Sequence, residues 1–236
     1  LCSHKGVKVI EDCSHALGAT YKGRRIGNEG DMAFYSFEKS KVMSTYSGGV
    51  VSTNDAELGR KLREIYRQAE FPNKSYSKKL MHGFMHSYLL QNTFSKAFAS
   101  PWLNWYYKDK VLETVSPDEL ESKRPNFYGC KLIAPLATVA RMQLSRLDQI
   151  NESRRKRSAV WREWCLRNGY SPPLVLEHSS PVLVRYPVLV EPDKKEDLLW
   201  MIKMGVQPGV WFTTRTHPVE INLEGCPNGI KAARQM

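Results

Sequence analysis

Three short apolar segments separated by glycine-rich turns lie in the first quarter of the chain, and they indicate an α/β fold. Val7–Ile10 is followed by acidic residues and predicts a short buried strand whose end presents the carboxylate of Asp12. Met32–Phe37 is a second strand candidate, and Val50–Thr53, which follows a Gly-Gly pair, is a third. Because ligands bind at the carboxyl ends of the strands in open α/β sheets, we expect the chemistry of this protein at those ends.

Three kinds of polar side chain follow these strands in order. Asp12 supplies a carboxylate, Ser36 a hydroxyl and Lys41 an amine. Pyridoxal phosphate needs such groups, because a lysine carries the cofactor, a carboxylate pairs with its pyridine nitrogen, and hydroxyl and backbone N–H groups hold its phosphate. Each residue alone also has an ordinary interpretation as a strand-end or surface side chain, and Lys39 is a nearby competitor for the lysine role.

The match of this region to a known family is long and ordered. It covers the stretch VIEDCSHALGATYKGRRIGNEGDMAFYSFEKSKVMSTYSGGVVST. This stretch resembles the core of the DegT/StrS group of sugar-nucleotide aminotransferases, which reads approximately EDxAQxxGAxYxGxxxGxxGDxxxFSFxxxK…GGxVxT. The resemblance implies that Asp12 binds the pyridine nitrogen, that Ser36 binds the cofactor phosphate, and that Lys41 carries the cofactor. The SFxxxK register selects Lys41 over Lys39.

The chain departs from the family pattern at three places. His15 stands where the family has a glutamine that contacts the ring oxygen of the cofactor. An imidazole also donates a hydrogen bond there, and a satisfied core histidine is the alternative interpretation. The family's Asn-x-Arg segment, which reaches the cofactor of the partner subunit, falls near Gly129–Lys131, where the asparagine is absent. Ser47 replaces the acidic residue that precedes the Gly-Gly turn.

Two downstream segments extend the resemblance. Gln143–Arg155, QLSRLDQINESRR, resembles the family's QLxxLDxxNxxR helix, and Phe212–Pro218 resembles its loop that ends in a histidine. In that loop Arg215 and His217 are candidates for binding the phosphates of the substrate, since an arginine fork suits a diphosphate. A purely structural loop is the alternative.

The resemblance implies the fold class of the fold-type-I transferases that depend on pyridoxal phosphate: a partial large α/β domain with a mainly parallel sheet, and a smaller C-terminal α/β domain. We expect residues 1–135 to form the partial large domain and residues 136–236 to form the long helix and the partial small domain. The further expected elements are a helix from Ala56 to about Ala69 capped by Asp55, a long or kinked helix over Leu136–Asn168 ended by Gly169, a strand over Val182–Val190, a helix over Asp193–Met204 and a strand over Gly205–Phe212.

Residues 71–125 are rich in aromatic residues and have an irregular pattern of polar residues, and they are interpreted as an insertion. Its aromatic residues include Phe84, Tyr88, Phe94, Phe98, Trp102, Trp105, Tyr106 and Tyr107. Core or dimer packing is the favoured role for these side chains, and a surface that skims a membrane is the alternative. Lysines interrupt any long apolar face, which favours the first role.

Charge and cysteine content limit the class of partner and the compartment. The formal net charge is +11, which favours an anionic partner such as nucleic acid, phospholipid or a phosphorylated metabolite. The dense basic run Arg154–Arg157 has no interleaved aromatic residues and is interpreted as a solvated helix face. The five cysteines form no CxxC pair, so we expect a reducing compartment, the cytoplasm, and no metal site. No run of about 18 apolar residues is present, and no stable membrane insertion is expected.

The chain begins without methionine and ends within a basic helical pattern, so we expect a fragment that lacks both ends of the family's full chain. Such a fragment is expected to bind the cofactor weakly and to aggregate when it is produced alone, because strand edges would lack neighbours.

The function implied by the resemblance is transfer of an amino group from an amino acid, glutamate being the expected donor, to a keto nucleotide sugar, in the biosynthesis of cell-surface polysaccharides or of secondary-metabolite sugars. The full enzyme is expected to be a homodimer with its sites at the interface and without a nucleic-acid partner. One alternative is a catalytically inactive or regulatory relic. Another is the dehydratase branch of the family, which has histidine at the lysine position, and Lys41 argues against it.

Overall fold

A computed structural model describes residues 3–91, 93–110 and 116–190 of the 236-residue chain. These residues form two compact units. Among the described residues, the first unit contains those up to Ser116 together with Arg124–Arg155 and Val175–Val184, and the second contains Pro117–Lys123, Lys156–Leu174 and residues 185–190.

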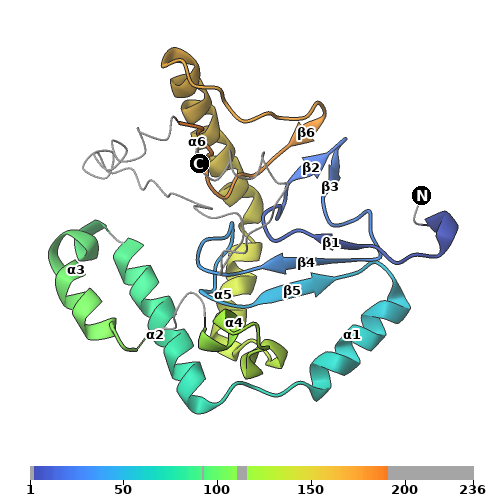
Figure 1. Cartoon of the computed structure of the whole chain (residues 1–236), viewed down its shortest axis with the longest axis vertical. Helices are drawn as coiled ribbons and strands as arrows, with labels where there is room; N and C mark the ends of the chain where they lie inside the picture. Colours follow the sequence, from blue (N-terminus) through green and yellow to red (C-terminus); the bar gives the residue numbers. More distant parts are fainter. Residues whose placement is uncertain (1–2, 92, 111–115, 191–236) are drawn as a thin grey trace. The chain divides into compact units, whose positions relative to one another are not determined.

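The first unit contains a three-stranded sheet made of β1 (Ile10–Asp12), β4 (Met32–Ser36) and β5 (Gly49–Ser52), in the order β1-β4-β5 (Figure 1). β1 runs parallel to β4, but β5 runs antiparallel to β4. In the described residues the sheet is therefore mixed, which corrects the expectation of a mainly parallel sheet. A parallel return needs a crossover, usually through a helix. The segment between β4 and β5 instead folds back on itself, since the backbone N–H of Phe37 donates to the Gly48 carbonyl at 2.8 Å and that of Thr45 donates to the Phe37 carbonyl at 3.0 Å.

The first strand is shorter and more exposed than its sequence predicts. β1 begins at Ile10 and not at Val7, and these two side chains are 58% and 55% exposed. Phe34 and Val51 on the neighbouring strands are also exposed. A strand becomes buried only when layers cover both faces of its sheet. Within the described residues β1 pairs with β4 alone, and so the expected buried strand is wrong here.

A second small sheet joins segments that are far apart in the sequence. It contains β2 (Thr20–Tyr21), β3 (Arg24–Arg25) and β6 (Ser179–Ser180), all antiparallel, in the order β3-β2-β6. Lys22 and Gly23 both have positive φ, at 48° and 77°, as a two-residue hairpin turn requires. A glycine-containing turn between the first two strand candidates, which the sequence predicts, is confirmed.

The strand expected over Val182–Val190 is wrong, because the only pairing nearby in the described chain is at β6. Pro181 and Pro187 have no N–H to give to a ladder. The carbonyls of Leu183 and Val184 accept hydrogen bonds from the Arg154 guanidinium, at 3.1 and 3.2 Å, in place of a neighbouring strand.

Helices make up much of the remaining described chain. They are α1 (Ala56–Gln68), α2 (Lys74–Gln91), α3 (Thr93–Tyr107), α4 (Pro117–Leu120), α5 (Ala134–Leu144) and α6 (Leu147–Arg167), with short 3-10 turns at Ser3–Lys5 and Asn126–Gly129. The predicted cap of α1 is confirmed, since Asp55 accepts the N–H groups of Glu57 and Leu58 at 2.8 and 2.9 Å. In the described chain no helix is both long and apolar enough to cross a membrane.

The long helix predicted after Leu136 is present in its kinked form. It is divided into α5 and α6 at Ser145 and Arg146, where the N–H of Arg146 donates to the Gln143 carbonyl at 3.0 Å, an i to i−3 bond. Gly169 ends α6 with φ +76°, and the N–H of Tyr170 returns to the Cys165 carbonyl at 2.9 Å. This is the left-handed C-terminal cap that glycine favours.

Two apolar clusters of the first unit fix the segment that follows β4. Phe37, Val42 and Met43 are buried with Leu147 of α6 and with Val182. In the second cluster, Leu80 of α2 is buried with Ile133 and with Leu136, the first-turn leucine of α5, and Tyr46 packs against them. The segment between β4 and β5, residues 37–48, which we call the lysine loop, is therefore attached to α2, α5 and α6.

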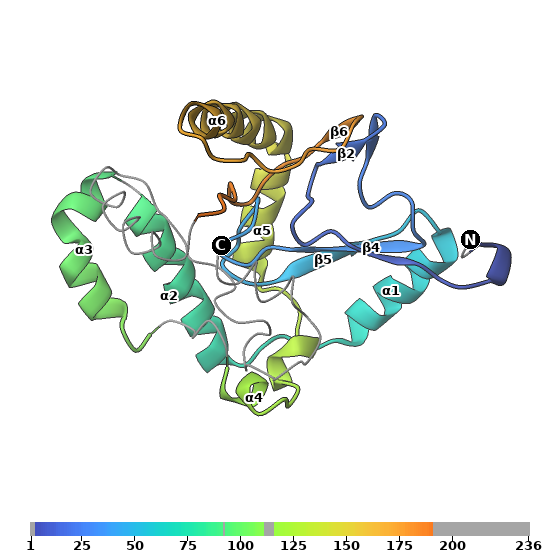
Figure 2. The ribbon, with the colours of Figure 1, turned by 45° about the horizontal axis from the view of Figure 1, so that its top comes forward.

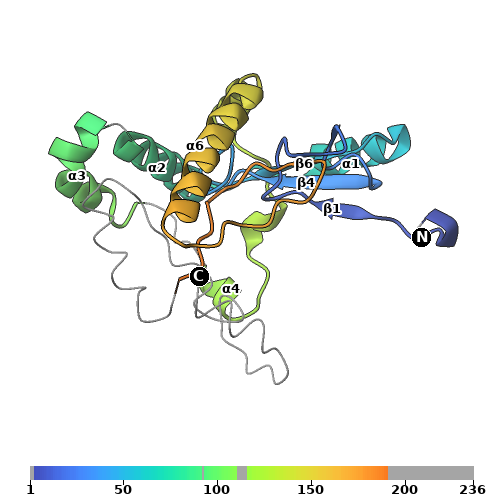
Figure 3. The same ribbon diagram turned by 90° about the horizontal axis from the view of Figure 1, so that it is seen from above.

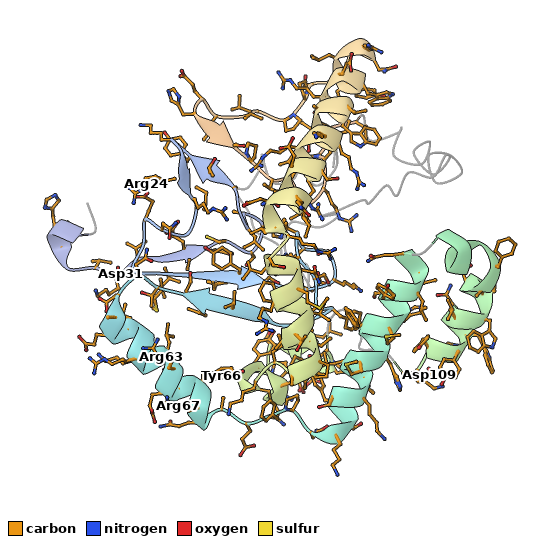
Figure 4. The ribbon with its side chains drawn as sticks, turned by 180° about the vertical axis from the view of Figure 1, so that it is seen from behind. Arg24, Asp31, Arg63, Tyr66, Arg67 and Asp109 are labelled. Atoms are coloured by element: carbon orange, nitrogen blue, oxygen red, sulfur yellow. The ribbon has the colours of Figure 1, made fainter. Side chains whose placement is uncertain are left out.

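A carboxylate at the centre of β1 fixes the loop before β4. Glu11 accepts the backbone N–H groups of Gly27, Glu29 and Gly30 at 2.9, 2.8 and 2.6 Å. Burial alone would raise the pKa of Glu11, but the three donors, led by Gly30, together hold that pKa below its ordinary value. Asp31, at the start of β4 in Figure 4, ties the same region to Val9 through a 2.8 Å hydrogen bond. The order of this region thus depends on ionised carboxylates.

Replacing Glu11 with glutamine should lower the free energy of unfolding by about 1 kcal/mol at neutral pH, because a neutral amide accepts less strongly than a carboxylate and brings unwanted donors. Since the folded pKa of Glu11 is lowered, its contribution is complete above the unfolded value of about 4.3 and is lost as pH falls through the folded pKa. Urea unfolding of the whole protein at neutral and acidic pH measures this. The exposed Glu163→Gln is the control, and an equal pH dependence in both variants would contradict the assignment.

Candidate functional site

Asp12 and Ser36 lie at the same edge of the sheet, on neighbouring strands. Asp12 ends β1 and Ser36 ends β4, and the parallel register places Asp12 opposite Phe34. Because side chains alternate along a strand, Phe34 and Ser36 share one face of the sheet, and Asp12 shares it with them. Figure 3 shows β1 and β4 side by side from above. The fold therefore brings together the carboxylate and the hydroxyl that the sequence places 24 positions apart.

Lys41 meets the loop that follows β1. Its Nζ lies 2.5 Å from Nε2 of His15, and its backbone N–H donates to the Glu38 carbonyl at 3.0 Å, which closes a turn of the lysine loop. Partial desolvation lowers the pKa of His15, and the positive charge of Lys41 lowers it further. The negative charges of Asp12 and Glu38 raise this pKa, but by less. A neutral imidazole beside a protonated amine is the arrangement in which Nε2 accepts the hydrogen bond. His15 is exposed, so its interpretation as a core histidine is wrong.

Asp12 is held in its ionised form. One of its oxygens accepts the backbone N–H of Ser14 at 2.9 Å. The hydroxyl and the N–H of Ser14 lower the pKa of Asp12 most, and the positive charge of Lys41 lowers it further. A carboxylate with this pKa stays negative across the neutral range and suits a protonated ring nitrogen.

Ser36 accepts a backbone hydrogen bond at the start of the lysine loop. Its Oγ accepts the N–H of Glu38 at 3.3 Å, and a hydroxyl that accepts one hydrogen bond can still donate its own hydrogen to a phosphate oxygen. The Glu38 carboxylate accepts the Ser40 N–H at 2.8 Å and the Ser40 hydroxyl at 2.5 Å, within the same loop. The groups present thus match the chemistry of pyridoxal phosphate: an amine, an anionic partner for the ring nitrogen and a hydroxyl for the phosphate.

The opposite face of the sheet is used differently. Tyr35, Val50 and Ser52 point to that face and line a largely apolar cavity of about 480 Å³, to which Ala140 and Leu144 of α5 also contribute. Figure 2 shows α5 next to β5. Asp12, Ser36 and Lys41 do not line it. The alternation of side chains along β4 therefore separates the candidate cofactor site from this cavity.

The sequence alone assigns no role to Gln143, but its side chain binds the backbone of the lysine loop through two hydrogen bonds. Its Nε2 donates to the Ser44 carbonyl at 2.7 Å, and its Oε1 accepts the Ser44 N–H at 3.1 Å. Ser44 lies three residues after Lys41. Its backbone N–H and its carbonyl are thus both paired with the side chain of Gln143 on α5. The QLSRLDQINESRR segment was the available signal, but only the structure shows what this glutamine contacts.

The same helix segment also holds the loop that carries His15. The buried Asn151 donates to the Leu17 carbonyl at 3.3 Å, and Arg155 donates to the Gly18 carbonyl at 3.4 Å. Gly18 has φ +78°, and a Cβ there would lie 2.1 Å from Nδ2 of Asn151, so only glycine fits this approach.

The basic run Arg154–Arg157 is only partly the solvated helix face that the sequence predicts. Lys156 and Arg157 are exposed, whereas Arg154 and Arg155 are half-buried. Their guanidinium groups are engaged by the carbonyls of Leu183, Val184 and Gly18. These two arginines are structural donors, because unpaired carbonyls in the first unit need partners that strands do not supply.

Replacing Gln143 with alanine should lower the free energy of unfolding by about 1 to 3 kcal/mol, since two backbone groups lose their partner. Hydrogen exchange at the Ser44 amide should also become faster than in the parent protein. Gln149→Ala, which removes an exposed glutamine of α6 six positions further along the chain, is the matched control. Unchanged exchange at Ser44 would show that this contact does not order the lysine loop.

The segment Gly129–Lys131, where the asparagine of the family pattern is absent, contacts the C-terminal end of α1 through Lys131. The backbone N–H of Lys131 donates to the Glu70 carbonyl at 2.8 Å, and its Nζ donates to the Arg67 carbonyl at 3.0 Å. The ammonium also lies over the rings of Tyr66 and Phe71, 5.5 and 5.3 Å from their centroids. Tyr66 and Arg67 on α1 are labelled in Figure 4. This segment therefore anchors the C-terminal end of α1.

The candidate substrate residues Arg215 and His217 lie outside the described residues, as do the helix expected over Asp193–Met204 and the strand expected over Gly205–Phe212. The division into domains at residue 135 stays a prediction. In the described parts of the chain no group of three His, Cys, Asp or Glu side chains is placed to hold a metal ion.

A lysine, an ionised aspartate and a serine at the carboxyl edge of an α/β sheet are the groups that the resemblance implies for a fold-type-I transferase that depends on pyridoxal phosphate. A solved DegT DnrJ EryC1 StrS aminotransferase from Brucella abortus has this fold, and it matches 90% of this chain and 44% of its own with a TM-score of 0.55 at 18% identity. The expected fold class is confirmed.

Residues 1–95 match the model of the DegT/DnrJ/EryC1/StrS aminotransferase family, and the predicted resemblance is confirmed. GDP-perosamine synthase of Caulobacter vibrioides is 44% identical over 68 residues, 29% of this chain and 18% of that protein. UDP-N-acetyl-3-dehydro-alpha-D-glucosamine 3-aminotransferase of Acidithiobacillus ferrooxidans is 47% identical over 66 residues, 28% of this chain and 18% of that protein. The matched segment thus spans less than a fifth of each of these two curated relatives.

Proposed function

We propose that the whole protein is an aminotransferase that depends on pyridoxal phosphate and moves an amino group from an amino acid to a keto nucleotide sugar. The observation that carries the proposal is the contact of Lys41 with His15 beside the ionised Asp12, at the edge of the sheet where β1 and β4 end. The family match and the relatives named for nucleotide-sugar products and substrates support it.

Each residue has a distinct task in this proposal. When bound, pyridoxal phosphate supplies an electron sink for the substrate carbon. Asp12 keeps the ring nitrogen protonated, and Ser36 holds the phosphate. His15 orients Nζ of Lys41 through Nε2, and the N–H of its imidazole donates to the ring oxygen of the cofactor. Nζ of Lys41 covalently holds the cofactor, and once released it moves the proton between the substrate carbon and the cofactor carbon.

The proposed substrates follow from the relatives and from two residues of the C-terminal segment. The donor is proposed to be glutamate, and the acceptor a sugar joined to a nucleoside diphosphate, in polysaccharide or secondary-metabolite sugar biosynthesis. Arg215 and His217 are proposed to bind the diphosphate, with a structural loop as the alternative.

We further propose a homodimer with sites at the subunit interface, located in the cytoplasm. A sugar-nucleotide dehydratase is the second candidate enzyme, but it would have histidine where this chain has Lys41. A catalytically inactive or regulatory relic is the candidate outside the enzymes, motivated by the absent asparagine near Gly129–Lys131.

The test is to load the whole protein with pyridoxal phosphate, fix the bound cofactor with borohydride and map the labelled peptide. Label on Lys41, together with glutamate-dependent amination of a keto nucleotide sugar, supports the proposal. Label on Lys39 would refute the site, and label on Lys41 without turnover on any keto nucleotide sugar would favour the relic.

A further inference from the structure

The α2–α3 hairpin carries a row of aromatic side chains that its own packing leaves uncovered. Phe98, Trp102 and Trp105 of α3 are 76%, 57% and 73% exposed, and Tyr106 beside them is 39% exposed. Their spacing places Phe98, Trp102 and Trp105 on one side of the helix. We call these four residues the aromatic face. Figure 4 shows side chains standing out from the side of α3 that faces away from α2.

The other side of α3 is used for packing within the hairpin. Leu103 is 4% exposed, and the ring of Tyr107 lies 5.9 and 5.1 Å from the rings of His82 and His86 on α2. The side of α3 that carries Leu103 and Tyr107 is therefore already packed within the hairpin. Core packing, one of the roles expected for these aromatic residues, is wrong for the aromatic face.

The hairpin is also strongly positive. Residues 71–110 contain six lysines, one aspartate, no glutamate and no arginine. Lys78 and Lys79 of α2 and Lys108, just after α3, are exposed. Nζ of Lys110 lies over the ring of Tyr106, 3.3 Å from its centroid. Amphipathic aromatic rings next to ammonium groups are the combination that suits the interface between headgroups and acyl chains of an anionic bilayer.

We propose that the α2–α3 hairpin is a peripheral membrane-binding element, with the aromatic face lying in the interface of an anionic lipid bilayer and the lysines on its phosphate headgroups. The hairpin rests on the membrane and does not cross it. Gly83 of α2 packs so closely on Tyr46 that an added Cβ would lie 2.2 Å from its ring, so the bound hairpin also sets the position of the lysine loop relative to the membrane.

Two other occupants of this face fit less well. A second copy of the chain, packed by two-fold symmetry, would bring the same lysines of both copies together, and like charges repel. A single-stranded nucleic acid would stack its bases on free aromatic ring faces, but one ring face of Trp102 is already stacked on Tyr106, with the centroids 5.3 Å apart.

Flotation of the whole protein with vesicles tests the proposal. The probes are vesicles of phosphatidylcholine alone and of equal parts phosphatidylcholine and phosphatidylglycerol. The protein should float with the mixed vesicles and not with the neutral ones, and added salt should weaken binding. Replacing Phe98, Trp102 and Trp105 with serine should abolish flotation, and Lys78→Glu with Lys79→Glu should weaken it by about tenfold or more.

The matched control replaces Val160, Leu174 and Leu176, which are equally exposed apolar residues outside the hairpin, with serine. Its flotation should equal that of the parent protein. Absence of flotation in the parent, or equal flotation with neutral vesicles, would overturn the proposal. Self-association that the serine variant loses, without vesicle binding, would assign the aromatic face to a second copy, and retention of RNA in place of vesicles would assign it to nucleic acid.

Discussion

Replacing Lys41 with alanine is expected to abolish covalent attachment of pyridoxal phosphate and to lower amino transfer by about three to four orders of magnitude. The reason is that one amine both holds the cofactor and moves the proton. The side chain meets His15 and lies away from the buried clusters of the first unit, so its removal should leave the fold intact. The absorbance spectrum of the bound cofactor and the rate of amination measure the two effects.

Lys39→Ala is the matched control for this variant, since it removes an exposed lysine from the same loop. It should keep the spectrum and nearly all of the activity. A Lys41 variant that retained the lysine-bound spectrum would show that another amine carries the cofactor. Loss of attachment in the Lys39 variant alone would identify Lys39 as the lysine that carries the cofactor.

Replacing Asp12 with asparagine is expected to leave cofactor attachment possible and to lower turnover by at least about a hundredfold. An amide has no charge with which to keep the pyridine nitrogen protonated, so the electron sink is weakened. Asparagine still offers an oxygen to the Ser14 N–H, which Asp12 accepts at 2.9 Å, and the loop after β1 should therefore keep its conformation. Peptide mapping after borohydride reports attachment, and single-turnover kinetics report the chemistry.

Asp148→Asn is the control for Asp12, because it neutralises an aspartate whose partner is the exposed Arg25 and which is remote from Lys41 in the sequence. It should turn over like the parent protein. Near-parent turnover in the Asp12 variant would refute the proposed role of this carboxylate, whatever the state of attachment.

The expected boundaries of the elements were reliable where the signal is local. The helix start at Asp55, the end of α6 at Gly169 and the turn at Lys22 and Gly23 all depend on a cap or on positive φ, which neighbouring residues specify. The predictions for Val7 and for Val182–Val190 failed because burial and strand pairing depend on what lies across the sheet, and one segment does not contain that information.

The sequence by itself determined which chemical groups are present and in what order: a carboxylate at Asp12, a hydroxyl at Ser36 and a lysine five positions later, in a register that resembles one family. These follow from residue type and spacing. Only the tertiary structure decided how the groups are held. Gln143 binds the backbone at Ser44, Asn151 and Arg155 bind the carbonyls of Leu17 and Gly18, and the aromatic face of α3 is left uncovered. The contacts of these side chains join segments about 100 or more positions apart, and such pairings are set by the packing of helices on the sheet and not by local sequence.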